Sequence, residues 1–243
     1  MYSKLKALAK QILPKPFLEK NEFFLRKVIS LKYRGTQHQC NICSIKLKRF
    51  VDLDGKDLLC PNCGSRSRTR RLYKQLTKHN VLNGNVLHFS PPKILYKQFK
   101  QLKMNYYSSD YENEFTADYN FNITSIPKNE NFFNTIICYH ILEHIENDKE
   151  AMSELYRVLQ PGGTCFIQTP FTDGETKEDP SITSPKDRKK HFGQEDHVRI
   201  YALPELISRL RAAGFKTEIK SYTNDMYNGM NTETIILAKK INL

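Results

Sequence analysis

From about residue 82 to the end of the chain, short strand-like runs alternate with helical ones. Strand patterns are expected at residues 86–89, 106–109, 115–121, 135–139, 165–169, 216–222 and 234–238, and helical patterns at 94–102, 148–159 and 204–213. Pro161 and the two glycines after it stop the 148–159 helix before the next strand. Such an alternation is typical of a parallel sheet covered by helices, so this part is predicted to be an α/β domain.

The chain divides by composition into three zones. Residues 1–39 are basic and helical in pattern, residues 40–75 carry four of the six cysteines, and residues 82–243 form the predicted α/β domain. In the first zone, Leu5, Leu8 and Ile12 indicate one helix, which Pro14 ends. A second short helix is indicated by Phe23, Phe24, Val28 and Leu31. This zone could lie on an anionic membrane surface or pack its apolar stripe on the protein itself.

The chain is strongly basic, with 38 Lys and Arg against 26 Asp and Glu and a formal net charge of +12. This balance favours anionic partners such as nucleic acid, acidic lipid headgroups or phosphorylated substrates, although lysines on a solvated surface give the same total. No apolar run approaches the roughly 20 residues of a membrane-spanning helix, and the N-terminus lacks the apolar core of a signal peptide. We therefore expect a cytoplasmic protein without a transmembrane segment.

Four cysteines in the second zone form two C-x2-C pairs, which are Cys40 with Cys43 and Cys60 with Cys63. Two residues between thiolates let one turn offer both sulfurs to a single ion, and two such turns supply the tetrahedral set that Zn²⁺ prefers. Between the pairs, "KLKRFVDLDGKDLL" indicates strand, turn and strand. The pattern resembles a zinc ribbon with a structural Zn²⁺. Two disulfides or a duplicated redox pair are the competing interpretations.

An arginine-rich stretch, "GSRSRTRRLYK", follows the second cysteine pair. It contains Arg66, Arg68, Arg70 and Arg71. These side chains could grip phosphates, including those of RNA. Alternatively, they could connect the ribbon to acidic parts of the next domain.

The strongest motif is "NTIICYHILEHIENDKEAMSELYRVLQPGGTCFIQTPF", residues 134–171. It resembles the second half of a class I S-adenosylmethionine-dependent methyltransferase, of the type 11-like kind. Over residues 82–240 the resemblance implies a Rossmann-like α/β fold with a seven-stranded sheet, the last strand reversed. It also implies S-adenosylmethionine as cofactor. The pairing of "LHFSPP" with "HFGQEDHVRIY" after a cysteine pair is similar to a bacterial methyltransferase-like group linked with surface polysaccharide genes, which implies a glycan or lipid-linked sugar as acceptor.

The resemblance implies where the cofactor binds. In the family the first strand leads into a glycine-rich turn, whereas here the turn is "HFSPPK" and no glycine lies between Gly84 and Gly162. Because the cofactor carries no pyrophosphate, the need for glycine is relaxed. The carboxylate of Asp110 is expected to accept the ribose hydroxyls. The residues implied to bind the cofactor are His88, Phe89, Ser90, Pro91, Asp110, Asn122, Ile123, Tyr139 and His140.

Candidates for proton transfer and substrate binding follow the fourth and fifth strands. His140 is the first candidate for a base, while Glu143 and His144 after it are expected to be structural. A long polar loop is expected after residue 169 and over the ligand crevice. Within it, Asp196 and His197 form a candidate catalytic pair, because an aspartate can orient an imidazole as base. His191, Gln194 and Arg199 are expected to bind substrate unless these groups only pin the loop to the domain.

The sequence therefore favours an S-adenosylmethionine-dependent methyltransferase whose zinc ribbon aids acceptor recognition or stability. The family resemblance implies a glycan or lipid-linked sugar as acceptor, whereas the basic net charge favours RNA. One alternative is a methyltransferase-like scaffold that lost catalysis with its glycines. Another is an RNA-binding or RNA-methylating protein that uses the ribbon and the arginines of residues 66–71.

Overall fold

The computed structural model describes residues 11, 12 and 14–241. They form two compact units, of which the first runs to His79 and includes Tyr222–Glu233, and the second comprises Asn80–Ser221 with the last strand. The helix expected around Leu5 and Leu8 lies outside the described residues. In the part of the chain that the structure describes, no helix has the length and apolar character that crossing a membrane requires.

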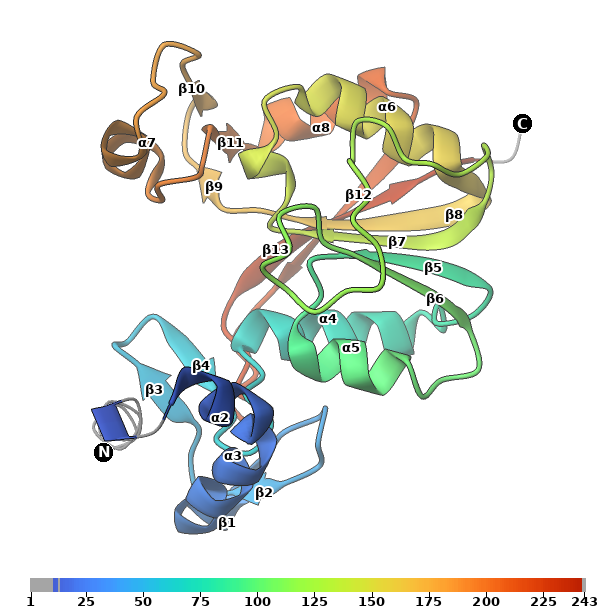
Figure 1. Cartoon of the computed structure of the whole chain (residues 1–243). Coiled ribbons are helices and arrows are strands. Elements are labelled where there is room, and N and C mark those ends of the chain that lie inside the picture. The colour runs from blue at the N-terminus through green and yellow to red at the C-terminus, as the bar shows by residue number, and fades with distance from the viewer. Residues whose placement is uncertain (1–10, 13, 242–243) are drawn as a thin grey trace. The chain divides into compact units, whose positions relative to one another are not determined.

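The second unit is built on a mainly parallel sheet (Figure 1). Its strands, in spatial order, are β12 (Lys216–Tyr222), β13 (Glu233–Lys239), β8 (Leu159–Gln168), β7 (Phe133–Tyr139), β5 (Asn85–Phe89) and β6 (Asn105–Ser109). The four strands from β8 to β6 pair in parallel, whereas β13 runs antiparallel to β8. The expected α/β class and the reversed last strand are therefore confirmed.

The sheet has six strands within the described residues, where the sequence predicted seven. The missing strand is the one expected at residues 115–121, which makes a single parallel bridge between Ser109 and Tyr119. Two backbone N–H groups of this segment donate to serine hydroxyl oxygens of β6 instead of to backbone carbonyls. Asp118 N donates to Ser108 Oγ over 2.9 Å, and Phe121 N donates to Ser109 Oγ over 2.8 Å. These side-chain bonds replace the ladder that a seventh strand would need.

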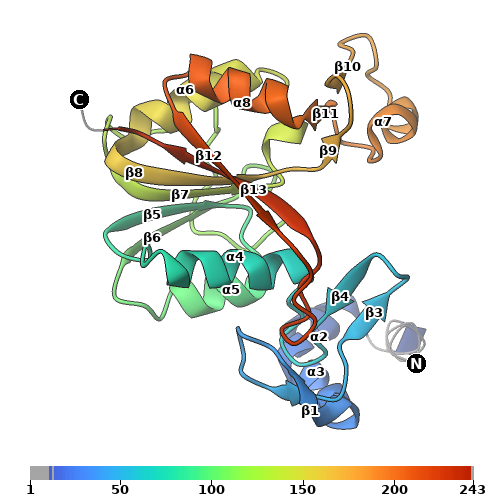
Figure 2. The same ribbon diagram turned by 180° about the vertical axis from the view of Figure 1, so that it is seen from behind.

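Helices cover both faces of the sheet (Figures 1 and 2). On one face lie α6 (Asp148–Val158) and α8 (Leu203–Ala212), and on the other lies α5 (Lys93–Phe99). Side chains of β5 alternate between the two faces of the sheet. Leu87 and Phe89 belong to the apolar core under α6 and α8. His88 faces the opposite side, with its ring 5.9 Å from that of Phe99 in α5. This alternation buries both faces of the strand.

The first unit combines short helices with small antiparallel strand pairs. Its elements are α2 (Lys15–Lys20), α3 (Glu22–Ser30), η1 (Leu31–Tyr33), β1 (Arg34–Gln39), β2 (Lys46–Leu47), β3 (Val51–Leu53), β4 (Asp57–Leu59) and α4 (Ser67–Lys78). The predicted hairpin is confirmed as β3 and β4, joined through Asp54 and Gly55, whose φ angles are 56° and 71°. Both residues adopt the left-handed conformation that a tight hairpin turn requires.

The apolar stripe of α3 is exposed. Phe24, Val28 and Leu31 expose 67%, 50% and 58% of their surface. Phe24 and Val28 are four residues apart and lie on one side of α3, and Leu31 follows three residues later at the start of η1. The interpretation that this stripe packs on the protein itself therefore does not hold for these three side chains.

Arg70 and Arg71 hold the first unit together. Arg70 is fully buried, its guanidinium donates to Leu58 O and Asn228 O, each over 2.8 Å, and its Cζ lies 4.4 Å from the centre of the Phe50 ring. Arg71 Nη2 donates to the carbonyl oxygens of residues 223 and 231 over 2.7 and 2.8 Å. Half of the arginine cluster is therefore engaged with the unit's own backbone and is withdrawn from phosphate binding.

Replacing Arg70 should destabilise the first unit. Arg70→Met would remove the guanidinium donors from the carbonyl oxygens of Leu58, Ser65, Asn228 and Gly229, of which Ser65 O keeps Cys60 N as a donor. We expect a loss of at least about 3 kcal/mol in the free energy of unfolding, measured by urea titration with circular dichroism. Arg68 is exposed, so Arg68→Met is the matched control, with a change within about 0.5 kcal/mol. Equal stability of the two variants would contradict the assignment.

Candidate functional site

The candidate site lies at the carboxyl ends of β5 and β7. Strand β5 pairs with β6, the next strand in the chain, along one edge. Along its other edge it pairs with β7, so the direction in which strands are added to the sheet reverses here. Open α/β sheets bind ligands at such a switch point. The residues that follow the two strands, Ser90 and His140, have φ angles of 44° and 54°. Non-glycine residues adopt this left-handed conformation rarely, and they concentrate at functional sites.

Ser90 and Asp110, both expected to bind the cofactor, contact each other at this edge. Ser90 Oγ donates to Asp110 Oδ1 over 2.6 Å, and Ser90 N donates to Ser109 O over 2.7 Å. Phe115 N donates to Asp110 Oδ2 over 2.9 Å, and Asp110 is 4% exposed. The carboxylate is therefore held in place through both of its oxygens.

The other residues expected to bind the cofactor fall into two groups. Phe89 and Ile123 belong to the apolar core of the second unit, and Pro91 is buried beside Ser90. Tyr139 is half-buried at the end of β7. Asn122 is exposed, and its Oδ1 accepts from Thr124 N and Oγ1 over 3.0 and 2.9 Å. The core members are therefore buried, while Asn122 begins a short turn at the surface.

His88 lies away from the other candidates. It is 1% exposed on the α5 side of the sheet, and its Nδ1 lies 3.0 Å from the hydroxyl of Tyr106. Burial lowers the pKa of His88 to about 3, so the imidazole is neutral. The sequence-based assignment of His88 to the cofactor site conflicts with this position, because alternate residues of a strand face opposite sides.

Three imidazoles gather beyond the end of β7, and each points its Nδ1 at an oxygen. His140 Nδ1 lies 3.0 Å from Glu143 Oε1, His144 Nδ1 lies 3.1 Å from Asp196 Oδ2, and His197 Nδ1 lies 3.0 Å from Phe192 O. An oxygen that only accepts requires the nitrogen to carry the proton, so Nε2 of each neutral ring is the acceptor. Asp196 therefore orients His144, not His197 as expected for the catalytic pair.

Glu143 is the buried charge of this group. It is 1% exposed in η2 (Leu142–His144). Burial works to raise the pKa of its carboxyl, but the hydrogen bond from His140 helps to hold the pKa below its usual value. The carboxylate therefore stays ionised at neutral pH. The sequence alone favoured a structural role for Glu143 and His144, and the only signal for more was their closeness to His140 in "HILEH".

Several buried polar atoms at this edge have no hydrogen-bond partner among the described residues. They include Glu143 Oε2, Gln168 Oε1, Thr169 Oγ1 and His197 Nε2. Gln168 ends β8, and its carbonyl accepts from His140 N over 2.8 Å. Buried polar atoms are nearly always paired in native proteins, so this concentration indicates a site for a polar ligand.

The segment after β8 was expected to be a loop but contains structure of its own. It comprises β9 (Phe171–Thr172), β10 (Lys177–Glu178), α7 (Pro185–Phe192) and β11 (Arg199–Ala202), with β11 pairing to both short strands. Arg199, expected to bind substrate, is 6% exposed and donates to the carbonyl oxygens of Leu142 and Glu146 over 3.2 and 2.9 Å. It therefore positions the η2 turn. His191 and Gln194 are exposed.

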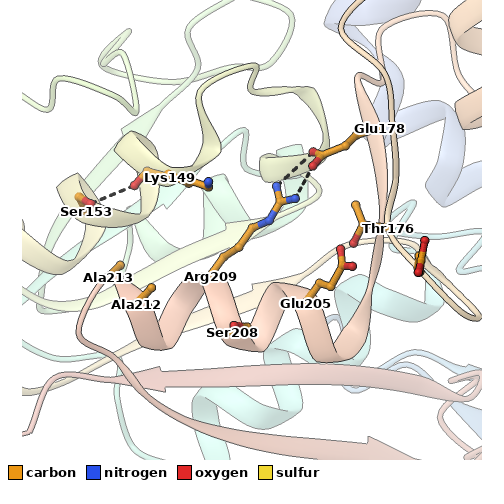
Figure 3. Close-up of a pocket in the computed structure, with 10 residues that line it drawn as sticks. Lys149, Ser153, Thr176, Glu178, Glu205, Ser208, Arg209, Ala212 and Ala213 are labelled. Carbon is orange, nitrogen blue, oxygen red and sulfur yellow. Dashed lines mark hydrogen bonds and ion pairs between the residues drawn. The ribbon is translucent and has the colours of Figure 1, made fainter.

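A pocket of about 590 Å³ lies between α6, α8 and residues 175–178 (Figure 3). Arg209 of α8 reaches across it to Glu178, whose carboxylate also accepts from Arg199 Nε over 2.9 Å. The hydrogen bond from Arg209 lowers the pKa of Glu178 in spite of partial burial. This pocket is lined by none of the predicted site residues. Its ion pairs instead connect α8 to Arg199 and so to η2.

The four predicted zinc ligands meet in the first unit. The sulfurs of Cys40, Cys43, Cys60 and Cys63 all lie within 4.8 Å of one another. Asn62 Nδ2 donates to Cys43 Sγ over 3.3 Å, and Ser65 Oγ lies 3.1 Å from Cys63 Sγ. All six cysteines of the chain are unbridged, which excludes the disulfide interpretation for this structure.

Comparison with known proteins identifies a family described as a methyltransferase domain, which matches residues 65–218. A mitochondrial ubiquinone biosynthesis O-methyltransferase from Dictyostelium discoideum is 24% identical over 128 residues, covering 49% of this chain and 36% of the relative. A tRNA U34 carboxymethyltransferase from Campylobacter hominis is 26% identical over 129 residues, covering 53% of this chain and 41% of the relative. The chain thus spans about two-fifths of the length of these curated relatives.

Solved structures show the same fold. A SAM-dependent methyltransferase from Archaeoglobus fulgidus superposes with a TM-score of 0.50 at 13% sequence identity. The match covers 70% of this chain and 93% of that one. At this identity the likeness establishes the α/β fold of the second unit and nothing about the acceptor.

The buried His88 should make the protein acid-sensitive. Its folded pKa of about 3 lies below the ordinary value of 6.5, so the unfolded chain binds more protons between these values. Stability from this group is therefore full above pH 6.5 and is lost as the pH falls. Between pH 7 and 4.5 the wild type should lose roughly 2 kcal/mol more than His88→Gln in urea unfolding. His79→Gln, at an exposed position, should follow the wild type, and parallel curves for all three would refute the assignment.

Proposed function

The chain belongs to the methyltransferase domain family, and on this premise we propose that it transfers a methyl group from S-adenosylmethionine. The observation that carries the proposal is the edge where β5 and β7 end in left-handed Ser90 and His140 beside the fixed carboxylate of Asp110. Ser90 takes the backbone conformation that glycine usually supplies, so the absence of glycine does not remove the turn. This argues against the inactive scaffold alternative.

In this proposal the residues at the edge divide the work. Asp110 binds the ribose hydroxyls, Asn122 and Ile123 contact the adenine, and Ser90, Pro91 and Tyr139 line the methionine part. Bound S-adenosylmethionine supplies an electrophilic methyl group. His140, with Nδ1–H donated to Glu143, presents Nε2 toward a proton of the acceptor. His191 and Gln194, both exposed, are left as candidates for acceptor contacts.

For the acceptor, the relatives named above act in ubiquinone biosynthesis and on tRNA, and no comparison supports the glycan expected from the sequence. We infer that the acceptor is met at an anionic membrane surface. The exposed stripe of Phe24, Val28 and Leu31 supports this, as do the exposed Lys20 and Lys27 nearby. RNA is the second candidate, favoured by the tRNA relatives and the net charge but weakened by the burial of Arg70 and Arg71.

We also propose that the four cysteines hold one structural Zn²⁺. Four sulfurs fill a tetrahedral site and leave no position for water or substrate. The contacts from Asn62 and Ser65 are the outer hydrogen bonds that orient metal-bound thiolates.

Asp110→Ala should weaken S-adenosylmethionine binding by at least about 100-fold, because two hydrogen bonds to a charged group are lost. Isothermal titration measures the affinity. Glu112→Ala, exposed in the same segment, is the control and should bind as the wild type does. No binding by the wild type at millimolar cofactor would sink the enzyme proposal and favour the scaffold.

Sedimentation with vesicles that contain anionic lipid tests the membrane surface. The double variant Phe24→Glu with Val28→Glu should bind at least about tenfold more weakly, because two apolar side chains leave the interface. Tyr111→Glu, at a side chain 59% exposed in the second unit, is the control. Unchanged partitioning of the double variant would reject the surface. Steeply salt-dependent binding of a short RNA without vesicle binding would favour the RNA candidate.

A further inference from the structure

A second group of metal-binding side chains lies beyond the carboxyl end of β7. Its members are Glu143 and His144 of η2 and His197, and their ligand atoms all lie within 4.8 Å of one another. Glu143 and His197 are 1% and 2% exposed, whereas the side chain of His144 is 29% exposed. We propose that this group binds a divalent transition-metal ion, which in turn binds a hydroxyl oxygen of the acceptor.

The protonation of the two imidazoles suits a metal ligand. The Nδ1 atoms of His144 and His197 donate to Asp196 and to the carbonyl of Phe192. The remaining nitrogen of each neutral ring therefore carries a lone pair. Metal-binding histidines are oriented in this way by a carboxylate or a backbone carbonyl. Asp196 thus acts as a positioning residue for His144.

Two of the three ligands also have a buried atom that no described group satisfies. These atoms are Glu143 Oε2 and His197 Nε2. Glu143 Oε1 already accepts from His140 Nδ1, and His197 Nδ1 donates to Phe192 O, so the remaining oxygen and nitrogen are left as acceptors. Two lone pairs that converge without a donor between them create an electronegative site, and a cation satisfies both at once.

The geometry is close to that of a bound ion. Ligands about 2.1 Å from a tetrahedral metal lie roughly 3.4 Å from one another, so a spacing of up to 4.8 Å must close by about 1.4 Å at most. His144 can supply this movement, because its side chain is partly exposed. Val198 N donates to Glu143 O over 2.9 Å, which fixes the two parts of the site, η2 and the strand that begins at Arg199, in register.

The donor set selects the type of ion. Two imidazoles and one carboxylate suit zinc and its first-row neighbours, whereas Mg²⁺ prefers oxygen ligands and retains water. Three protein ligands leave at least one position open, unlike the four sulfurs of the first unit. The two sites therefore differ in chemistry as well as in place, because one is closed and sulfur-rich and the other is open.

The open position defines the class of acceptor, and this step rests on the proposed methyl transfer. A hydroxyl bound to the ion loses its proton more readily. The hydroxyl oxygen forms the bond to the methyl carbon while the carbon–sulfur bond breaks, and the sulfonium sulfur takes that electron pair to become a thioether. The proton goes to His140, which Glu143 orients. The acceptor is therefore an alcohol, phenol or sugar hydroxyl.

Metal content and Co²⁺ spectra test the site without any activity assay. The full chain, refolded and dialysed against excess Zn²⁺, should retain about two ions, and Mg²⁺ should not occupy the second position. His144→Gln, at the most exposed ligand, should retain about one ion, as should His197→Gln. His79→Gln, outside the cluster, should retain both. A wild type that retains a single zinc ion, or a His144→Gln variant that retains two, would overturn the proposal.

Co²⁺ loading keeps the test decisive if a variant misfolds. In the wild type, thiolate-to-Co²⁺ charge-transfer bands should saturate at the first equivalent, and further d–d bands without sulfur character should grow with the second. Absence of the second set overturns the site. S-adenosylmethionine titration is run separately, so failure of the cofactor to bind would remove the methyl-transfer step while leaving the metal result intact.

Discussion

The buried carboxylate of Glu143 is the constraint on which the edge of the second unit depends. An ionised group with 1% exposure is stable only among partners. Its Oε1 fixes the ring of His140, and its backbone oxygen receives Val198 N. Arg199 then ties the surrounding turn through two carbonyl oxygens. One charge thus places a candidate base, a short helical turn and the segment after β8 relative to one another.

The first unit depends on a different buried charge. Arg70 has no carboxylate partner among its described contacts and is neutralised by backbone carbonyl dipoles and the face of Phe50. Gly229 makes this arrangement possible, because its φ is 63° and a Cβ there would lie 2.4 Å from the Phe50 ring. The four cysteine sulfurs gather in the same unit. The hydrogen bonds of Arg70 and the cysteine cluster stabilise a unit that is too small for a large apolar core.

Features that depend on neighbouring residues agree with the sequence-based predictions, whereas features that depend on contacts between distant residues differ from them. Strand and helix patterns are local, and β12 coincides with the predicted range 216–222. The segment 115–121 looked like a strand locally, yet serine hydroxyls from β6 captured its amides. His88 and Arg70 were read as ligand contacts from their neighbours in sequence, but the face of a strand or helix decides which side chains are buried. Likewise, Asp196 was assigned to the adjacent His197, although folding brings His144 to it.

By itself the sequence determined the α/β class, the reversed last strand, the paired cysteines and the family, because periodicity, spacing and motif order are properties of the chain. It also placed Asp110 directly after the second strand, 20 residues beyond Ser90. Only the tertiary structure decided that Ser90 adopts the glycine-like conformation and that Glu143, His144 and His197 converge. The physical reason is that convergence depends on burial and on hydrogen bonds between residues more than 50 positions apart, which no local pattern encodes.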